Sequence, residues 1–161
     1  MEGVNSMARE ILFKAKRISD GEWVYGNYAF NDALKKERHF IFQNYAYENE
    51  VDINTLCQYT GLTDKNGNKI WENDILNVHQ FLFDGSEYEN EIIVSIEYME
   101  EMMCFGANLI EAKAIKEYMG YATDDVEKIV HPFNDFYGLH EESYEVIGNI
   151  FDNPELLGGG V

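Results

Sequence analysis

The sequence predicts a mainly β protein, either a small barrel or a strongly coiled antiparallel sheet, with an SH3-like hairpin region and one or two short helices. Three observations lead to this class. Apolar residues recur at every second position through most of the chain, which is the period of a half-buried strand. Aromatic residues make up 14% of the chain, and flat rings pack well on a pleated surface. Short turns separate the alternating segments, so consecutive strands are expected to pair as hairpins.

The first part of the chain predicts three strands. Residues 9–18 alternate, with Ile11, Phe13 and Ala15 on the face opposite the lysines. Asp20-Gly21 supplies a turn, because glycine tolerates positive φ. Residues 23–30 are then the partner strand of a hairpin, and residues 38–47 are a third, aromatic strand.

The middle of the chain predicts a tight turn and further strands. Residues 64–69 combine Asp, Asn and Gly between two apolar stretches, which is typical of a hairpin turn. Residues 75–83 and 92–98 alternate and are predicted strands, separated by an acidic loop at 84–90. Residues 102–105 are expected to return as a short strand.

Helices are predicted only in the second half. Residues 107–119 carry apolar side chains at three- and four-residue spacing, followed by a glycine that would end the helix. A weaker helix is expected from Thr123 to just before Pro132. Residues 143–151 form a final predicted strand. Asn153 and Pro154 then open a short terminal helix, as N-cap and first helical residue.

The length of 161 residues fits one ordinary domain. We expect a single domain over residues 9–157. Residues 1–8 are polar and patternless, and residues 158–161 are mostly glycine. Both ends are therefore expected to be loose termini.

Charge is the most unusual bulk property. The chain has 12 basic and 30 acidic residues, for a net charge of −18, and residues 70–161 hold twenty of the acids against three lysines. Direct nucleic-acid binding is not expected, because it needs several Lys or Arg residues to displace counterions from phosphates. The simplest interpretation of the charge is solubility. The alternatives are a docking face for a basic partner and a mimic of a phosphate array.

Cysteine usage and hydropathy bear on localisation. Cys57 and Cys104 lie in apolar surroundings and form no CxxC pair, which is typical of core thiols in a reducing compartment. No segment approaches the about 18 apolar residues of a membrane span, and no signal peptide is expected. The sequence therefore predicts a cytoplasmic protein without a membrane partner.

Catalytic and cofactor motifs are not found. The histidines form no HxxxH or HxH pair, and GxSxG and phosphate-binding glycine motifs are missing. The turn that starts at Asp64 does not fit a calcium loop, because Lys69 stands where an EF-hand has glycine. We expect no metal, no cofactor and no enzymatic activity. One alternative stays open, a metal-dependent hydrolase in which carboxylates converge with His79 or His131.

The most informative stretch is residues 60–76. It predicts a tight hairpin, a diverging turn at Glu72-Asn73-Asp74 and the entry to a strand. Asp74 is expected to accept backbone N–H bonds in that turn. A structural role is favoured for these residues, with ligand binding as the alternative.

This stretch resembles the signature of the YopX family of phage and prophage proteins of unknown function. Two further blocks are similar to the family, residues 9–26 and residues 144–156, and all three follow the family order. Asn73 stands where the family usually has glycine, and asparagine tolerates the left-handed conformation. The resemblance implies a mostly β protein and supplies no reaction. The candidate site residues that it marks are Tyr59, Thr60, Gly61, Leu62, Asp64, Gly67, Trp71, Glu72, Asn73, Asp74, Gly148 and Asn149.

Together these observations favour a non-enzymatic accessory protein of a phage or prophage that binds a host or phage protein. The first alternative is an acidic decoy that inhibits a DNA-binding or restriction enzyme. The second is the metal-dependent hydrolase. Self-association through a sheet edge or an apolar face also stays open, because the chain has more aromatic strand residues than its core needs.

Overall fold

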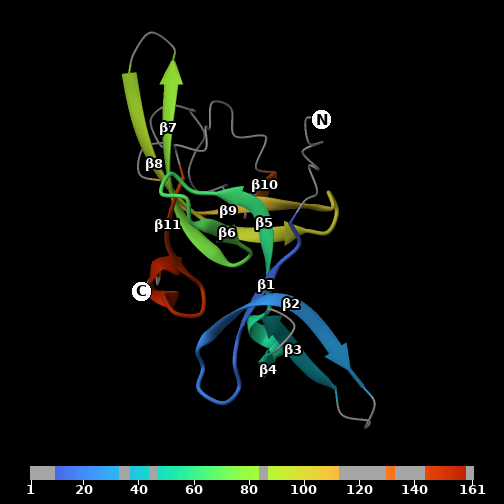
Figure 1. The fold of residues 1–161 in the computed structure, drawn as a ribbon. Coiled ribbons are helices and arrows are strands. Elements are labelled where there is room, and N and C mark those ends of the chain that lie inside the picture. The colour runs from blue at the N-terminus through green and yellow to red at the C-terminus, as the bar shows by residue number, and fades with distance from the viewer. Residues whose placement is uncertain are drawn as a thin grey trace, which may run out of the picture. The chain divides into compact units, whose positions relative to one another are not determined.

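The structure is a computed structural model that describes residues 10–32, 37–43, 47–83, 87–112, 130–132 and 144–158. The described chain is mainly β, as the sequence predicts, and forms two antiparallel sheets with two short 3-10 helices. Their strand orders are β4-β3-β2-β1-β5-β6 and β10-β9-β8-β7-β11. The chain divides into two compact units, residues 1–61 and residues 62–161 (Figure 1). Whether residues 9–157 fold as one cooperative domain stays a prediction.

In the first unit, strands β1 to β4 pair in chain order, and β5 pairs with the other side of β1. The turn at Asp20-Gly21 joins β1 to β2, with Gly21 at φ +75°. The core is small and aliphatic, formed by Ala15, Val24, Ile41 and Val51. The elements are β1 (Phe13–Lys16), β2 (Trp23–Asn31), β3 (Arg38–Gln43), β4 (Tyr47–Glu50), the 3-10 helix η1 (Ile53–Thr55) and β5 (Cys57–Thr63), which crosses the boundary at residue 61.

One additional link joins the first and fourth strands of this unit. Arg17 and Val51 form an isolated antiparallel bridge, and the N–H of Asp52 donates to the carbonyl of Lys16 at 2.9 Å. A single bridge does not close a barrel among the described strands. The barrel and the SH3-like hairpin therefore stay predictions.

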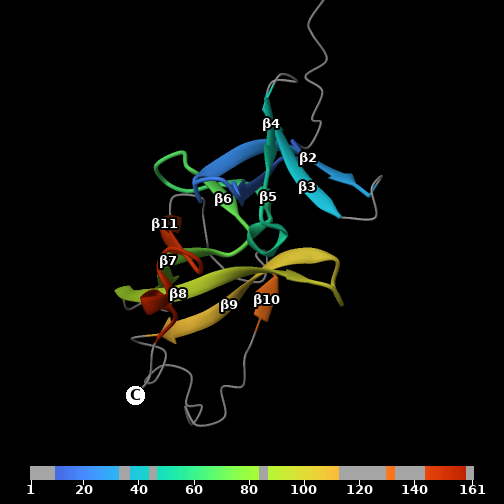
Figure 2. The same ribbon diagram turned by 90° about the horizontal axis from the view of Figure 1, so that it is seen from below.

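The second unit is the five-stranded sheet with the hairpin strand β6 (Lys69–Trp71). Figure 2 shows β7, β8 and β9 following one another across this sheet. Its strands are β7 (Asp74–Phe83), β8 (Glu87–Met99), β9 (Cys104–Ala112), β10 (Val130–Pro132) and β11 (Tyr144–Asn149), followed by the 3-10 helix η5 (Pro154–Leu157). The buried core consists of Ile70, Leu76, Val78, Ile92, Val94, Ile96, Ala107 and Tyr144.

The predicted helix over 107–119 is wrong for its first half, because residues 107–112 belong to β9. The register of β9 against β8 shifts between Ile93 and Val94, which pair with Glu111 and Leu109. This bulge leaves Ile110 as an extra residue and breaks the alternation. Apolar residues on its two sides then lie three apart, which imitates helical spacing. Residues 113–119 lie outside the described residues.

Three other sequence-based predictions differ from the structure in the type of element or in its bounds. Residues 130–132 form β10 and not the end of a helix, while residues 123–129 lie outside the described residues. Residues 87–90 extend β8 and are not a loop, because they pair with β7 up to Phe83↔Glu87. The strand predicted over 38–47 is two strands, β3 and β4. The predicted final strand and terminal helix are confirmed as β11 and η5.

Candidate functional site

The residues that resemble the family signature lie in and around the hairpin that joins β5 to β6. Asp64 is 4% exposed and stands at the start of the turn. Its Oδ1 accepts hydrogen bonds from the N–H groups of Asn66 (2.9 Å) and Asn68 (2.8 Å). Its Oδ2 accepts from Asn68 Nδ2 (3.1 Å) and from the N–H of Val146 (3.1 Å). One carboxylate therefore holds both the turn and strand β11.

Strand β11 lies at the edge of its sheet, so one of its sides has no neighbouring strand. The turn at residues 64–69 forms hydrogen bonds with it. Besides the bond from Val146 to Asp64, the N–H of Lys65 donates to the carbonyl of Tyr144 at 2.9 Å. Lys65 Nζ also contacts Glu145 Oε2 at 2.6 Å. Because edge strands expose unpaired backbone groups, this contact protects β11 and connects two signature blocks that are about eighty residues apart.

Burial raises the pKa of Asp64, but hydrogen bonds from the Asn68 side chain and from the N–H groups of Val146, Asn68 and Asn66 outweigh it, and the pKa is lowered below 3.8. The native state then binds fewer protons than the unfolded state, so this carboxylate stabilises the fold above its unfolded pKa. We expect this contribution to disappear as the pH falls from about 4 through the folded pKa. Acid unfolding of wild type and Asp64→Asn should show it, since the variant lacks this titration. Parallel pH profiles would contradict the assignment.

The diverging turn before β7 is held by a second set of bonds. Asp74 is 2% exposed, and its Oδ2 accepts from the N–H of Trp71 at 2.8 Å, as the sequence predicts. Asn73 adopts a left-handed conformation with φ +66°. Its N–H donates to the carbonyl of Ile96 (2.8 Å), and its carbonyl accepts from the N–H of Ile150 (3.0 Å). The turn therefore links β8 to the segment after β11.

The left-handed backbone of Asn73 gives a test of this turn. Asn73→Gly should keep the stability within about 0.5 kcal/mol of wild type, because glycine adopts this conformation without steric cost. Asn73→Ala should lower the free energy of unfolding by about 1 kcal/mol. Urea unfolding of both variants gives the comparison. A glycine variant less stable than the alanine variant would show that the Asn73 side chain matters more than its backbone.

Gly148 and Asn149 end strand β11 in a compact polar turn. A Cβ at Gly148 would lie 2.5 Å from Asn153 Oδ1, so a larger residue here would displace the Asn153 side chain. Asn149 Oδ1 accepts from the N–H groups of Phe151 and Asp152, each at 3.0 Å. Both residues serve to start the terminal segment that leads into η5.

The remaining signature residues also have structural positions. Tyr59 is 5% exposed, and its N–H donates to the carbonyl of Leu12 at 2.9 Å. Gly61 and Gly67 have φ of +94° and +82°. Leu62 packs against the core of the second unit, and Trp71 is buried. Thr60 lies in β5 and Glu72 follows β6, both partly buried. The signature residues thus lie along β5, in two turns and in β11.

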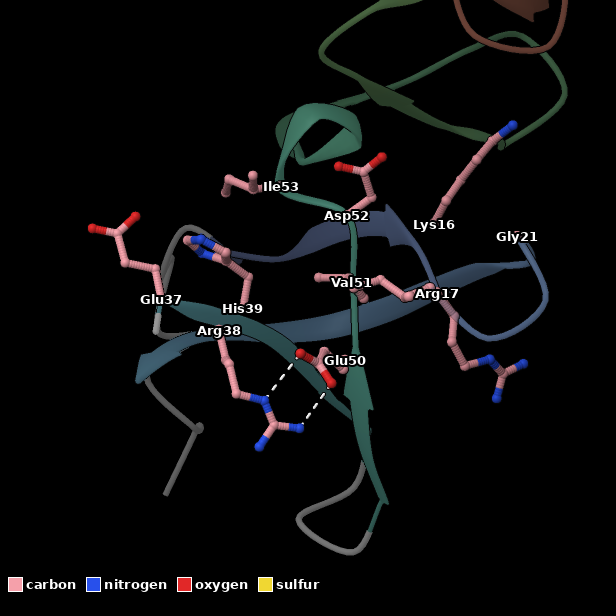
Figure 3. Close-up of a pocket in the computed structure, with 11 residues that line it drawn as sticks. Lys16, Arg17, Gly21, Glu37, Arg38, His39, Glu50, Val51, Asp52 and Ile53 are labelled. Carbon is pink, nitrogen blue, oxygen red and sulfur yellow. Dashed lines mark hydrogen bonds and ion pairs between the residues drawn. The ribbon is translucent and has the colours of Figure 1, made fainter. Parts of the chain in front are cut away.

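An open cavity of about 550 Å³ lies elsewhere, in the first unit, and no signature residue lines it. Its size falls in the range of ligand-binding clefts. Sequence reasoning missed it, because its lining comes from three separate stretches of chain that no motif marks. Figure 3 shows the lining side chains, which come from β1 and the following turn, β3, the end of β4 and η1: Lys16, Arg17, Ile18, Gly21, Glu37, Arg38, His39, Glu50, Val51, Asp52 and Ile53.

Apolar and aromatic groups shape the rim of this cavity. Ile18 and Ile53 are 63% and 40% exposed. The ring of His39 is fixed from one side by Tyr28, whose Oη lies 2.8 Å from Nδ1, and it packs on Phe30 with ring centroids 5.4 Å apart. The cavity therefore combines exposed aliphatic side chains with one firmly held aromatic wall.

Metal chemistry has no support in the described side chains. Among them, no three His, Cys, Asp or Glu residues come together as metal ligands. The side chains of His79 and His131, which the hydrolase alternative needs, lie outside the described part, as does His140. Cys57 is fully buried and Cys104 is partly buried, both as free thiols.

Comparison with known proteins identifies the family. The YopX protein family matches residues 12–158, and the chain belongs to this family. A crystal structure of protein EF1440 from Enterococcus faecalis is similar, with 21% identity, a TM-score of 0.43, and coverage of 92% of this chain and 99% of that one. No curated protein matches. None of the helices in the described segments is long and apolar enough to cross a membrane.

Proposed function

We propose that this YopX-family chain is a non-enzymatic accessory protein of a phage or prophage, and that it binds a host or phage protein in the cytoplasm. The observation that carries the proposal is the cavity of the first unit, which is open, of ligand size and bordered by exposed isoleucines. An apolar centre surrounded by a polar rim is the usual anatomy of a protein-binding surface.

A second argument comes from the signature residues. The carboxylates of Asp64 and Asp74 are buried and accept hydrogen bonds from the protein's own backbone. Catalytic groups must instead face a reacting molecule in a cleft. The burial of these polar groups supports a framework role for them, and we propose that other residues form the binding surface.

Photo-crosslinking in cells tests the proposal. A benzophenone amino acid at position 53, on the cavity rim, should give a discrete covalent adduct with one partner when the protein is made in the bacterium that carries the gene. The matched control is position 25, because Tyr25 is 47% exposed in the same unit and does not line the cavity. No adduct from position 53, or equal labelling from both positions, would contradict the proposal.

A further inference from the structure

The cations that line the cavity of the first unit are already engaged. Arg38 forms a two-point ion pair with Glu50, with Nε–Oε1 at 3.0 Å and Nη2–Oε2 at 2.7 Å (Figure 3). Arg17 donates from Nε to Asp20 Oδ1 at 3.0 Å and from Nη1 to Asn49 Oδ1 at 3.2 Å. A ligand that needed these guanidinium groups would have to break bonds within the protein.

The third cation that lines the cavity, Lys16, also has a contact within the protein. Its Nζ lies 5.5 Å from the centre of the Trp23 ring, within the range of a cation–π contact. In Figure 3 its ammonium group extends away from Glu37 and His39. Each of the three cations that line the cavity therefore already has a partner within the protein.

Two of the carboxylates that line the cavity, by contrast, have oxygen atoms that accept no hydrogen bond from a described residue. Glu37 is exposed, and within the described residues its carboxylate makes no hydrogen bond or ion pair. Asp52 uses Oδ1 to accept from the N–H (3.0 Å) and Nδ2 (2.9 Å) of Asn54. Its Oδ2 accepts no bond from a described residue. Among the described residues, the cavity carboxylates without an ion pair to a basic side chain are therefore those of Glu37 and Asp52.

From this imbalance we infer that the cavity binds a basic side chain, arginine or lysine, on an extended segment of the partner protein, with aliphatic residues next to it. The inference rests on the proposed function and names the chemistry of the same site. The carboxylate of Glu37 receives the cation, and the ring of His39 gives it a flat wall. Ile18 and Ile53 contact the aliphatic neighbours.

The test uses a defined peptide with the full-length protein. Acetyl-Gly-Leu-Arg-Leu-Gly-amide, titrated in an NMR experiment, should shift the amide signals of residues 16–18, 37–39 and 50–53. The same peptide with citrulline in place of arginine keeps the shape and removes the charge, and it should bind at least about fivefold more weakly.

Two variants of the protein test whether Glu37 is the carboxylate that binds the arginine. Glu37→Gln should weaken binding of the arginine peptide about threefold. Glu22→Gln changes the net charge equally at an exposed position outside the cavity, and it should leave binding unchanged. Because both positions are exposed, neither variant is expected to affect folding.

The outcomes separate the two proposals. No shift with the arginine peptide, equal binding of the citrulline peptide, or equal effects of Glu37→Gln and Glu22→Gln would overturn the basic-ligand inference. An adduct from position 53 in the crosslinking experiment would then still support protein binding through this cavity. If the adduct fails as well, both proposals fall.

Discussion

Replacement of Asp64 by asparagine is expected to lower the free energy of unfolding by about 2–3 kcal/mol at neutral pH, since the two bonds to one buried oxygen are lost and the remaining two lose their charged acceptor. Asparagine keeps one oxygen acceptor but places an amide N–H₂ where the other oxygen stood. If Oδ1 is kept, this amide faces the N–H of Val146 and Nδ2 of Asn68, which now meet a donor. Buried donors without an acceptor account for most of the cost. Urea unfolding measures it.

The control for this prediction is Asp32→Asn. Asp32 is exposed in the first unit, so the same chemical change should alter stability by less than about 0.5 kcal/mol. Hydrogen exchange gives a second, local readout. The amide of Val146 should exchange faster in Asp64→Asn, because its acceptor is the changed group. Wild-type stability together with wild-type exchange at Val146 would show that Asp64 does not hold β11.

Strand prediction succeeded where one face of a strand is buried in a continuous core. Residues 75–83 and 92–98 alternate because Leu76, Val78, Ile92, Val94 and Ile96 all enter the same core, and β7 and β8 are found there. It failed where pairing is irregular. The bulge at Ile110 changes which residues face the core, and sequence periodicity cannot show a bulge whose cause is the neighbouring strand.

The signature turns and the cavity also differ in how far the sequence predicts them. The roles of Asp74 and of the turn at 64–69 follow from local chemistry, since Asp and Asn accept or donate within a few residues of their own position. The bond from Val146 to Asp64 is not predictable from spacing, because it joins residues 82 positions apart. The cavity depends on three stretches of chain, which are brought together by the pairing of β1 and β3 with β2, the pairing of β3 with β4, and the bridge between Arg17 and Val51. Neither composition nor motif contains that information.

Gly26→Ala is expected to cost at least about 3 kcal/mol, because the new methyl group would overlap the backbone of the neighbouring strand. A Cβ at this position would lie 2.1 Å from the carbonyl oxygen of Phe42 and 2.9 Å from its carbonyl carbon. Phe42 pairs with Asn27 in the β2–β3 ladder, so the strands cannot separate without losing bonds. Gly21→Ala is the control, since Gly21 has φ +75° with nothing within 4 Å of its Cβ. It should cost only about 1 kcal/mol. Equal costs would mean that the close approach at Gly26 is wrong.

Gly26→Ala also tests whether residues 9–157 are one domain, because Trp23 reports on the first unit and Trp71 on the second. Fluorescence is measured in two backgrounds, each keeping one tryptophan and replacing the other by phenylalanine. Strand β5 pairs with β1 at Cys57 and Gln58, and it also pairs with β6, so loss of its order at one end is expected to reach the other. We therefore expect Gly26→Ala to shift the unfolding midpoint equally for both tryptophans. A shift for Trp23 alone would show that the two units unfold independently, since β5 would then not transmit the loss.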